Sequence, residues 1–236
     1  MRKFSLTILT AVGTVVVVGV AIVAARKAAD CHSETQCLVD FPDFHLQARF
    51  WGAFVRERAP GVRRIVMFPA AAPFFAQQQG RLLREALPET VDVVVWPETY
   101  EEWEPLRRDA QGLDAAQVTV LQGMCRDGEA PDLVLMYLCG PCEALYAQLQ
   151  GLYADHGVRF VLRFDCGSRP VDETAVAMHL QEGWLLACAV PRLTVDAAGA
   201  LTEPIDADAT EAEVIRRFLR AFDVVCAGGA FPTQPL

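Results

Sequence analysis

The residues best suited to chemistry are Cys139-Gly140-Pro141-Cys142, which follow an apolar run at 133–138 and precede a helical pattern that starts at Glu143. This order predicts a dithiol carried from the end of a strand to the start of a helix. The unpaired N–H groups and positive dipole end of a helix stabilise a thiolate, so a cysteine there ionises easily. Glycine allows a tight turn, and proline pre-sets the geometry of a first helical turn. The segment therefore favours thiol–disulfide exchange.

A metal centre or a bound cofactor is not expected. A zinc site would need two more thiol or imidazole ligands at paired spacing. Cys125, Cys166, Cys188 and the four histidines show no such spacing. The sequence also contains no glycine-rich phosphate loop. We therefore predict neither a metal nor a cofactor.

Length and charge limit the class of protein. The 236 residues leave about 200 for one or at most two domains once an N-terminal segment is set aside, enough to bury a core without disulfides. The net charge is -9. Nucleic-acid binding needs a basic surface, so no nucleic acid is expected as a partner.

The N-terminal segment predicts a membrane anchor. Residues 4–25 are uncharged and mostly apolar, long enough to cross a hydrocarbon core of about 30 Å. A cleavable signal peptide is the alternative, although its apolar stretch is normally shorter. Basic residues flank both sides of the span, and the eight cysteines fit an oxidising compartment. We therefore expect residues 1–27 to be a single-pass inner-membrane anchor, with a cytoplasmic N-terminus and the folded domain in the periplasm.

Between the anchor and the folded body, residues 28–61 resemble a tether. Apolar residues at helical spacing within 45–58 predict a docking helix. Cys31 and Cys37 are six residues apart and could close a small structural loop. No strand or helix start frames that pair, so it is not expected to be a second active site.

The rest of the chain predicts one α/β domain over residues 62–226, followed by a tail at 227–236. Short apolar runs indicate strands, and longer periodic stretches indicate helices. The final helix begins after Thr210, a good N-cap residue. The expected strands are 64–68, 91–96, 133–138, 158–164, 185–195 and 201–205, and the expected helices include 74–87, the segment from 143 to about 153, 173–182 and the segment from about 210 to 222.

The order of expected strands and helices from residue 133 to 222 resembles that of the thioredoxin superfamily. The CGPC tetrapeptide is identical to that of thioredoxins, and Val190-Pro191 resembles the loop in which these proteins carry a cis-proline. The resemblance implies a central mixed sheet flanked by helices. It also implies that Cys139 attacks a substrate disulfide, that Cys142 resolves the mixed disulfide, and that Val190 and a cis Pro191 contact the substrate. The implied partners are thiols and disulfides of envelope proteins and a redox partner protein.

Several positions depart from the thioredoxin pattern. Leu138 and Glu143 replace the usual Trp and Lys beside the dithiol. Asp132 is the one candidate for the buried carboxylate that assists proton transfer in that family, but it is about one residue out of place, and the alternative is that it simply starts the strand. A second alignment resembles periplasmic disulfide isomerases. In that alignment the segment Ala72-Pro73-Phe74-Phe75 takes the position of the dithiol, with both cysteines lost.

The remaining cysteines are candidates for structural disulfides. Cys125 with Cys166 and Cys188 with Cys226 are possible pairs, although a sequence cannot fix connectivity. Cys188 is also close to Pro191 in sequence, so a third redox thiol is the alternative. The candidates for structural disulfides are Cys31, Cys37, Cys125, Cys166, Cys188 and Cys226.

The sequence thus favours a membrane-anchored thiol–disulfide oxidoreductase that reduces or isomerises disulfides of envelope proteins. The alternative is a thioredoxin-like structural or binding module of a membrane-associated assembly, with a degenerate site at 72–75 and permanently paired cysteines.

Overall fold

The computed structural model divides the chain into two units, Met1–Asp40 and Phe41–Leu236. It describes residues 42–69, 72–103, 110–138, 143–164, 173–192, 194–229 and 231, all of which belong to the second unit. The predicted anchor, the predicted tether up to residue 41, Cys31 and Cys37 lie outside the described residues. None of the described helices combines the length and apolarity that a membrane span needs.

The described unit is an α/β fold built on a six-stranded mixed sheet of order β2-β1-β3-β4-β5-β6. Strands β1 to β5 run parallel, and β6 is antiparallel to β5. The α/β class with a mixed sheet flanked by helices agrees with the sequence prediction. The strands are β1 (Arg64–Phe68), β2 (Asp92–Val95), β3 (Leu133–Leu138), β4 (Arg159–Phe164), β5 (Leu185–Pro191) and β6 (Phe222–Cys226).

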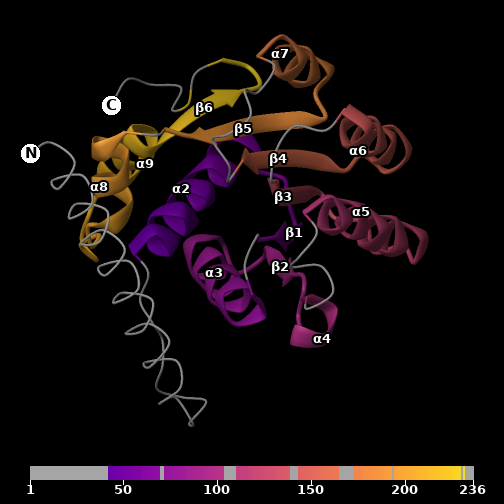
Figure 1. Ribbon diagram of the computed structural model, residues 1–236, viewed down its shortest axis with the longest axis horizontal. Helices are drawn as coiled ribbons and strands as arrows, with labels where there is room; N and C mark the ends of the chain where they lie inside the picture. The colour runs from indigo at the N-terminus through magenta and orange to yellow at the C-terminus, as the bar shows by residue number, and fades with distance from the viewer. Residues whose placement is uncertain are drawn as a thin grey trace, which may run out of the picture. The chain divides into compact units, whose positions relative to one another are not determined.

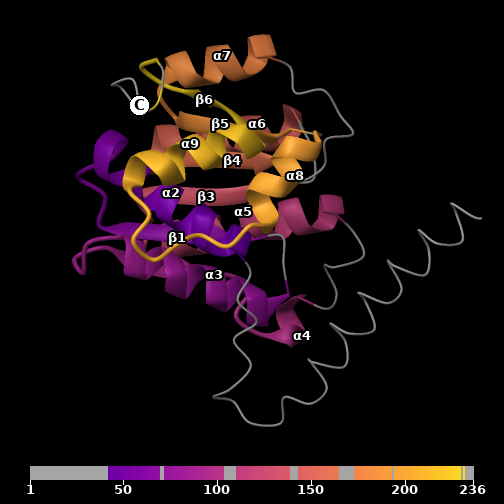
Figure 2. The same ribbon diagram turned by 90° about the vertical axis from the view of Figure 1, so that its left-hand side faces the viewer.

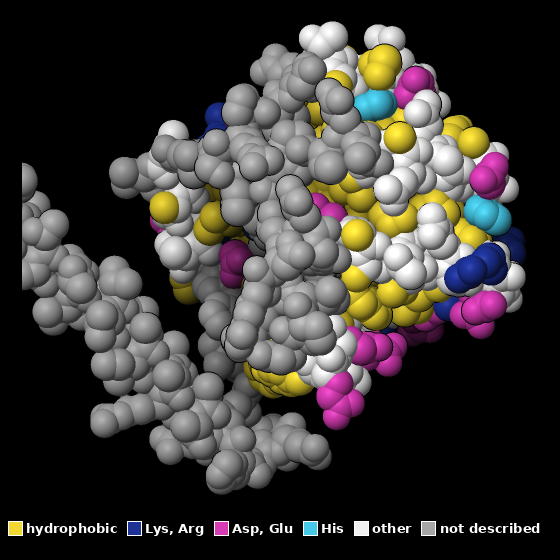
Figure 3. Space-filling view, turned by 45° about the vertical axis from the view of Figure 1, so that its right-hand side comes forward, with side chains coloured by type: hydrophobic (Ala, Val, Ile, Leu, Met, Phe, Trp, Pro, Cys, Tyr) yellow, Lys and Arg dark blue, Asp and Glu magenta, His cyan; other side chains and the backbone are white. Residues whose placement is uncertain are grey.

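Helices cover both faces of the sheet (Figures 1 and 2). One apolar cluster joins α2, α3, α8 and α9 to one face, and a second cluster joins α5, α6 and α7 to the other. Figure 3 brings forward the side of the molecule where α5, α6 and α7 lie, and apolar side chains are gathered there among polar ones. The helices are α2 (Pro42–Arg58), α3 (Pro73–Ala86), α4 (Tyr100–Trp103), α5 (Ala110–Arg126), α6 (Glu143–His156), α7 (Glu173–Glu182), α8 (Val195–Thr202) and α9 (Glu211–Ala221).

The central strands are apolar on both faces because helices cover both. All six residues of β3 are buried, and its side chains alternate between the two clusters, with Leu135 in one and Met136 in the other. A continuous apolar run without alternation is typical of a parallel strand inside such a sheet. The expected strands at 64–68 and 133–138 are confirmed with the same bounds.

The helix expected at 45–58 is α2, and it packs into the core. Phe50 and Phe54 are fully buried, and the ring of Phe50 stacks on Phe218 of α9 with centroids 3.7 Å apart. Phe231 closes the same aromatic cluster against Phe50 and Phe54. The compact unit therefore begins at Phe41, earlier than the domain start expected at residue 62.

Helix α9 forms where the sequence predicts it. The Thr210 hydroxyl accepts from the backbone N–H of Glu213, and the Glu213 carboxylate accepts from the Thr210 N–H, which makes a complete capping box. The buried residues Val214, Ile215, Phe218 and Ala221 lie on one side of the helix. That apolar stripe packs on the sheet beside α2.

Of the two closing strands expected at 185–195 and 201–205, the first forms only over Leu185–Pro191, and the second is not formed. Strand β5 ends at Pro191, and Thr194 caps a helix, α8, by accepting from the N–H of Ala197 at 3.1 Å. Residues 201–205 end that helix and continue as loop. The strand next to β5 is instead β6, which follows α9. A threonine N-cap before small, helix-forming alanines outweighs the strand pattern here.

Candidate functional site

The connections of β1 and β3 leave the sheet in opposite directions. These two strands are neighbours, with Phe68 level with Met136, yet β1 leads through α3 to β2 and β3 leads through α6 to β4. In open α/β sheets, ligands bind in the crevice outside the carboxyl ends of strands at such a switch point. This edge is therefore the first candidate for a functional site.

The predicted dithiol connects two elements of that edge. Leu138 ends β3, and Glu143 begins α6, as the sequence predicts. Cys139, Gly140, Pro141 and Cys142 themselves lie outside the described residues. The four-residue connection joins the carboxyl end of β3 to the first turn of α6.

The segment 72–75, which takes the dithiol position in the second alignment, follows β1, the strand next to β3. Pro73 is the first residue of α3, and Ala72 precedes it as an N-cap without a side-chain hydrogen bond. Because β1 and β3 pair directly, the two junctions named in the sequence flank the same switch point. Residues 72–75 carry only apolar side chains, so this junction offers no nucleophile.

Pro191 does not occupy the position that the thioredoxin resemblance implies. Among the described residues the cis peptide bond is Trp96–Pro97, so the expected cis bond before Pro191 is absent. Pro191 ends β5, which is separated from β3 by β4, a distance on the order of 10 Å between strand axes. Val190 pairs with Asp223 of β6, and β5 lies between β4 and β6. No free strand edge is left there for an added substrate strand.

The described cysteines are free thiols, buried at Cys125 and Cys188 and part-buried at Cys226. Cys125, Cys188 and Cys226 form no disulfide. Burial, followed by the nearby Cys226, raises the pKa of Cys188 to about 12, and burial raises that of Cys226 to about 11. Burial also raises the pKa of Cys125. Thiols with such pKa values carry very little thiolate at neutral pH, which counts against Cys188 as a third redox thiol.

The expected pairing of Cys188 with Cys226 conflicts with the strand register. Cys188 lies opposite Val225, and Cys226 lies opposite Ala187. Neighbouring positions along a strand point to opposite faces. Cys188 belongs to the cluster under α5 to α7, whereas Cys226 packs against the other cluster. A bridge between the two would require the strand pair to be rebuilt.

Cys125 lies in the last turn of α5, near the edge at which β3 begins. Cys166, its expected partner, lies outside the described residues.

Asp132 is not the proton-transfer carboxylate suggested by the sequence. Its Oδ2 accepts from the backbone N–H groups of Arg63 and Arg64 at 2.8 and 2.9 Å. These contacts lie at the amino edge of the sheet, where β1 and β3 begin. Asp132 therefore holds two strand starts together, a full strand length away from the switch point.

Another carboxyl group lies on the helix that covers the switch point. Asp114 is on α5, in the first half of the helix, and burial raises its pKa to about 6. Gln117 follows one turn later and is 1% exposed. Neither Asp114 Oδ1 nor Gln117 Oε1 has a hydrogen-bond partner. The signal in the sequence is a polar pair at i and i+3 on the side of α5 that carries Val118 and Leu121.

The other face of the same edge holds a buried polar cluster. The Arg163 guanidinium lies over the rings of Tyr137 and Phe222, with its central carbon 4.8 and 4.9 Å from their centroids. Gln47 Oε1 accepts from Arg163 Nη1 at 2.5 Å and from the Tyr137 hydroxyl at 3.2 Å. The cluster ties α2 to the carboxyl ends of β3 and β4.

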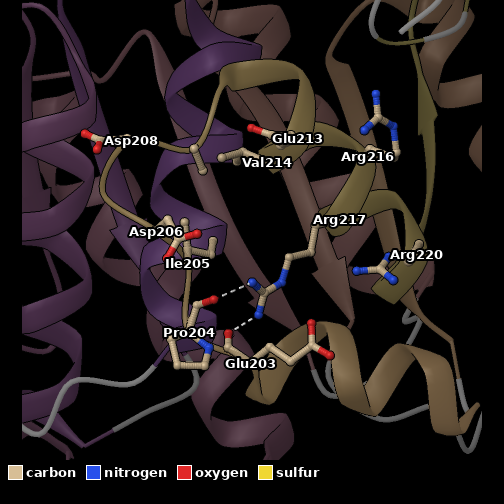
Figure 4. Close-up of a pocket in the computed structure, with 11 residues that line it drawn as sticks. Glu203, Pro204, Ile205, Asp206, Asp208, Glu213, Val214, Arg216, Arg217 and Arg220 are labelled. Carbon is tan, nitrogen blue, oxygen red and sulfur yellow. Dashed lines mark hydrogen bonds between the residues drawn. The ribbon is translucent and has the colours of Figure 1, made fainter.

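A groove of about 500 Å³ lies elsewhere, between α9 and residues 203–209 (Figure 4). Arg217 extends across it and donates Nε to the Ala200 carbonyl at 2.6 Å and Nη1 to the Pro204 carbonyl at 2.8 Å. Its Nη2 donates to the Glu203 carbonyl. These bonds cap the carboxyl end of α8, so the central cation of the groove has a structural role.

Comparisons with known proteins give no family. No family model matches the chain, and no curated protein matches it. The solved structures with detectable similarity include a mitochondrial aspartate aminotransferase from Trypanosoma brucei, at 11% identity and a TM-score of 0.39, over 76% of this chain and 47% of that one. A second is a SepCysS–SepCysE N-terminal domain complex, at 16% identity and a TM-score of 0.35, over 61% of this chain and 35% of that one.

The chain therefore spans less than half the length of either solved chain. Structural similarity at these TM-scores carries no argument about the fold or the activity of this protein. The site is interpreted from its own residues.

Proposed function

We propose that this protein is a membrane-anchored thiol–disulfide oxidoreductase that reduces or isomerises disulfides of envelope proteins through Cys139 and Cys142. The observation that supports the proposal is the setting of the tetrapeptide. Its neighbours, Leu138 and Glu143, are the last residue of a buried strand and the first residue of a helix at the switch point of the sheet. A helix start lowers the pKa of a thiol, and a switch point is where such sheets bind their ligands.

The proposed reaction uses only the two thiols. The Cys139 thiolate attacks one sulfur of the substrate disulfide, and the other substrate sulfur leaves as a thiolate that takes up a proton. The Cys142 thiolate then attacks the Cys139 sulfur and releases the reduced substrate. Two electrons pass to the substrate, and a disulfide forms between Cys139 and Cys142. A redox partner protein must reduce that disulfide before the next turnover.

Asp114 is the described group best suited to exchange protons at this edge. Helices α5 and α6 pack side by side, and both run from the carboxyl edge toward the amino edge. Asp114 and Glu143 therefore both lie near the helix starts at that edge. A carboxyl group with a pKa of about 6 can accept and return protons near neutral pH.

Three features that the thioredoxin resemblance implies differ in the described residues. The strand expected at 185–195 ends at Pro191, the strand expected at 201–205 is not formed, and Pro191 lacks the cis bond. The proposed exchange chemistry needs a thiolate at a helix start and does not depend on those features. The proposed location remains the inner membrane, through residues 4–25, with the folded unit in the periplasm.

The test is reduction of insulin disulfides by the full chain, with Cys139→Ser and Cys142→Ser as variants. Cys139→Ser should lower the rate by at least about 100-fold. Cys142→Ser should trap a mixed disulfide with the substrate, visible as a mass increase that dithiothreitol removes. Cys226→Ser is the matched control, because its thiol is part-buried and has a raised pKa, and it should retain the activity.

The alternative is a thioredoxin-like structural or binding module with a degenerate site at 72–75 and structural cysteines. The observation that favours it is the apolar junction at 72–75, whereas Cys125, Cys188 and Cys226 are free and do not form the pairs it implies. In that case Cys139 resists alkylation after mild reduction, and Cys139→Ser changes no rate. Either result would contradict the oxidoreductase proposal.

A further inference from the structure

An aromatic rim lies at the carboxyl edge, outside the site described above. Two of its members are exposed, Phe74 by 46% and Tyr100 by 57%. Large apolar side chains with such exposure are few among the described residues, and grouped exposure marks an interaction surface. The rim consists of Phe44 on α2, Phe74 and Phe75 on α3, and Tyr100 and Trp103 on α4.

The rim is continuous with the start of α2. The rings of Phe44 and Phe75 meet edge to face with centroids 6.4 Å apart, and Phe75 meets Phe74 in the same way at 5.4 Å. Tyr100 and Trp103 form a third such pair at 6.0 Å. These contacts lead from the first turn of α2 to the exposed ring of Phe74.

All three helices begin at the same edge. Helix α3 follows β1, and α4 follows the neighbouring parallel strand β2, so both start at carboxyl ends (Figure 2). Near the start of α2, Gln47 bonds Tyr137 toward the carboxyl end of β3. Helix α2 then runs to the opposite edge, where Arg58 donates to the Ala227 carbonyl. The chain from residues 1–41 therefore enters the folded unit beside the aromatic rim.

We propose that the aromatic rim docks in the headgroup layer of the bilayer that holds the predicted anchor, with zwitterionic lipid as its partner. The inference rests on the membrane anchor of the proposed function. Aromatic side chains are enriched at membrane–water interfaces, where the apolar part of the ring contacts lipid and its polar edge contacts water. Residues 26–41 reach at most about 55 Å when extended, which keeps the rim within range of the membrane.

The charges beside the rim decide which lipid fits. Glu98 and Glu101 are exposed next to Tyr100. The Glu102 carboxylate already has hydrogen-bond partners, since its Oε2 accepts from the N–H groups of Glu98 and Thr99 at 2.9 and 3.2 Å. Exposed carboxylates are repelled by anionic lipid and tolerated by zwitterionic headgroups. The surface therefore suits phosphatidylcholine or phosphatidylethanolamine better than phosphatidylglycerol.

Docking in this way would turn the proposed dithiol edge toward the membrane. The switch point between β1 and β3 lies at the same edge as α3 and α4. Client disulfides would then lie in membrane-proximal segments of other envelope proteins. Soluble disulfide proteins such as insulin would reach the dithiol of the anchored chain more slowly than such segments, but their reduction would still report its activity.

The test is photocrosslinking of the full chain in phosphatidylcholine nanodiscs. The photoreactive residue p-benzoylphenylalanine replaces Phe74 or Tyr100, and in control variants it replaces Met178 or Val225. The two controls are each 50% exposed, and they lie on α7 and β6, far along the strand order from β1 and β2. All four sites are exposed, so the replacements should not disturb packing.

Mass spectrometry should find lipid adducts at positions 74 and 100 several-fold above those at 178 and 225. Replacing half of the lipid by phosphatidylglycerol should reduce the adducts at 100. Equal yields at all four positions, or no lipid adduct at 74 and 100, would overturn the proposal. Lipid adducts report no thiol chemistry, so Cys139→Ser should leave them unchanged even if the oxidoreductase proposal fails.

Discussion

The two edges of the sheet treat their polar groups differently. At the amino edge, Asp132 accepts from two backbone N–H groups, and Arg64 pairs with Glu129 at 3.0 Å and with Asp92 at 3.8 Å. At the carboxyl edge, buried oxygens of Asp114 and Gln117 accept no hydrogen bond. Buried polar groups without partners cost free energy.

This difference indicates a division of roles between the edges. At the amino edge, Asp132 and the ion pairs of Arg64 hold strand starts and turns together, although Arg64 Nε donates no hydrogen bond. The carboxyl edge has a titratable carboxyl group, exposed aromatic rings and the connection with the two cysteines. It also has the Gln47, Tyr137 and Arg163 cluster, so both edges hold stabilising contacts, whereas the candidate functional groups lie at the carboxyl edge.

The largest effect on stability is expected from Asp132→Ala. The change leaves the N–H groups of Arg63 and Arg64 without their acceptor and should lower the free energy of unfolding by about 2 kcal/mol. Chemical denaturation measures the change. Asp127→Ala, in the exposed turn after α5, is the control and should stay within about 0.5 kcal/mol. A loss equal to that of the control would mean that the amino edge is not held by this carboxylate.

Asp114→Asn is expected to raise the free energy of unfolding at pH 7, whereas Asp132→Ala lowers it. Burial raises the pKa of Asp114 to about 6, so the folded state binds more protons than the unfolded state between pH 4 and 6. Stability contributed by this group therefore falls as pH rises through that window. Because the group is partly solvated, Asp114→Asn should stabilise the protein at pH 7 by only about 1 kcal/mol.

Denaturation at pH 4, 5, 6 and 7 checks this prediction. The variant should show a flatter pH dependence than the parent between pH 4 and 6, whereas Asp155→Asn on the exposed surface of α6 should leave the profile unchanged. A destabilised Asp114→Asn variant at pH 7 would show that the carboxylate has a compensating partner.

The smallest effect is expected from Glu129→Gln. Its ion pair with Arg64 is largely exposed on the glutamate side, and such pairs contribute less than about 1 kcal/mol. We expect a loss of about 0.3 kcal/mol that disappears in 1 M salt, because exposed charges are screened there. A loss as large as that of Asp132→Ala would show that the amino edge relies on this ion pair as much as on the Asp132 carboxylate that accepts from backbone N–H groups.

The regular elements of the fold were predictable because their signals are local. Buried parallel strands such as β3 are uninterrupted apolar runs, and α9 has both a capping threonine and an apolar stripe. The strand order was not predictable, because it depends on which strands pair across long sequence separations. The strand expected at 185–195 ends early, at Pro191, and the strand expected at 201–205 is absent, because the cap at Thr194 starts a helix instead.

The candidate site was predictable only in part. The setting of the two cysteines follows from the pattern around 133–138 and Glu143, which is local. Of the two interpretations of Asp132, the one in which it only starts the strand is confirmed, since it lies one residue before β3 at the amino end of that strand. Asp114 is distant in sequence and approaches the edge only through the crossover helix α5.

The stacking of α2 on α9 has a consequence for biosynthesis. Arg49 bonds the carbonyl of Ala209, 160 residues later, and the Phe50 ring has no stacking partner until Phe218 has been made. The face of α2 that packs on α9 therefore stays uncovered during most of translation, whereas α3, which also packs on α2, is made soon after it. The aromatic cluster around Phe50 is completed only when α9 emerges.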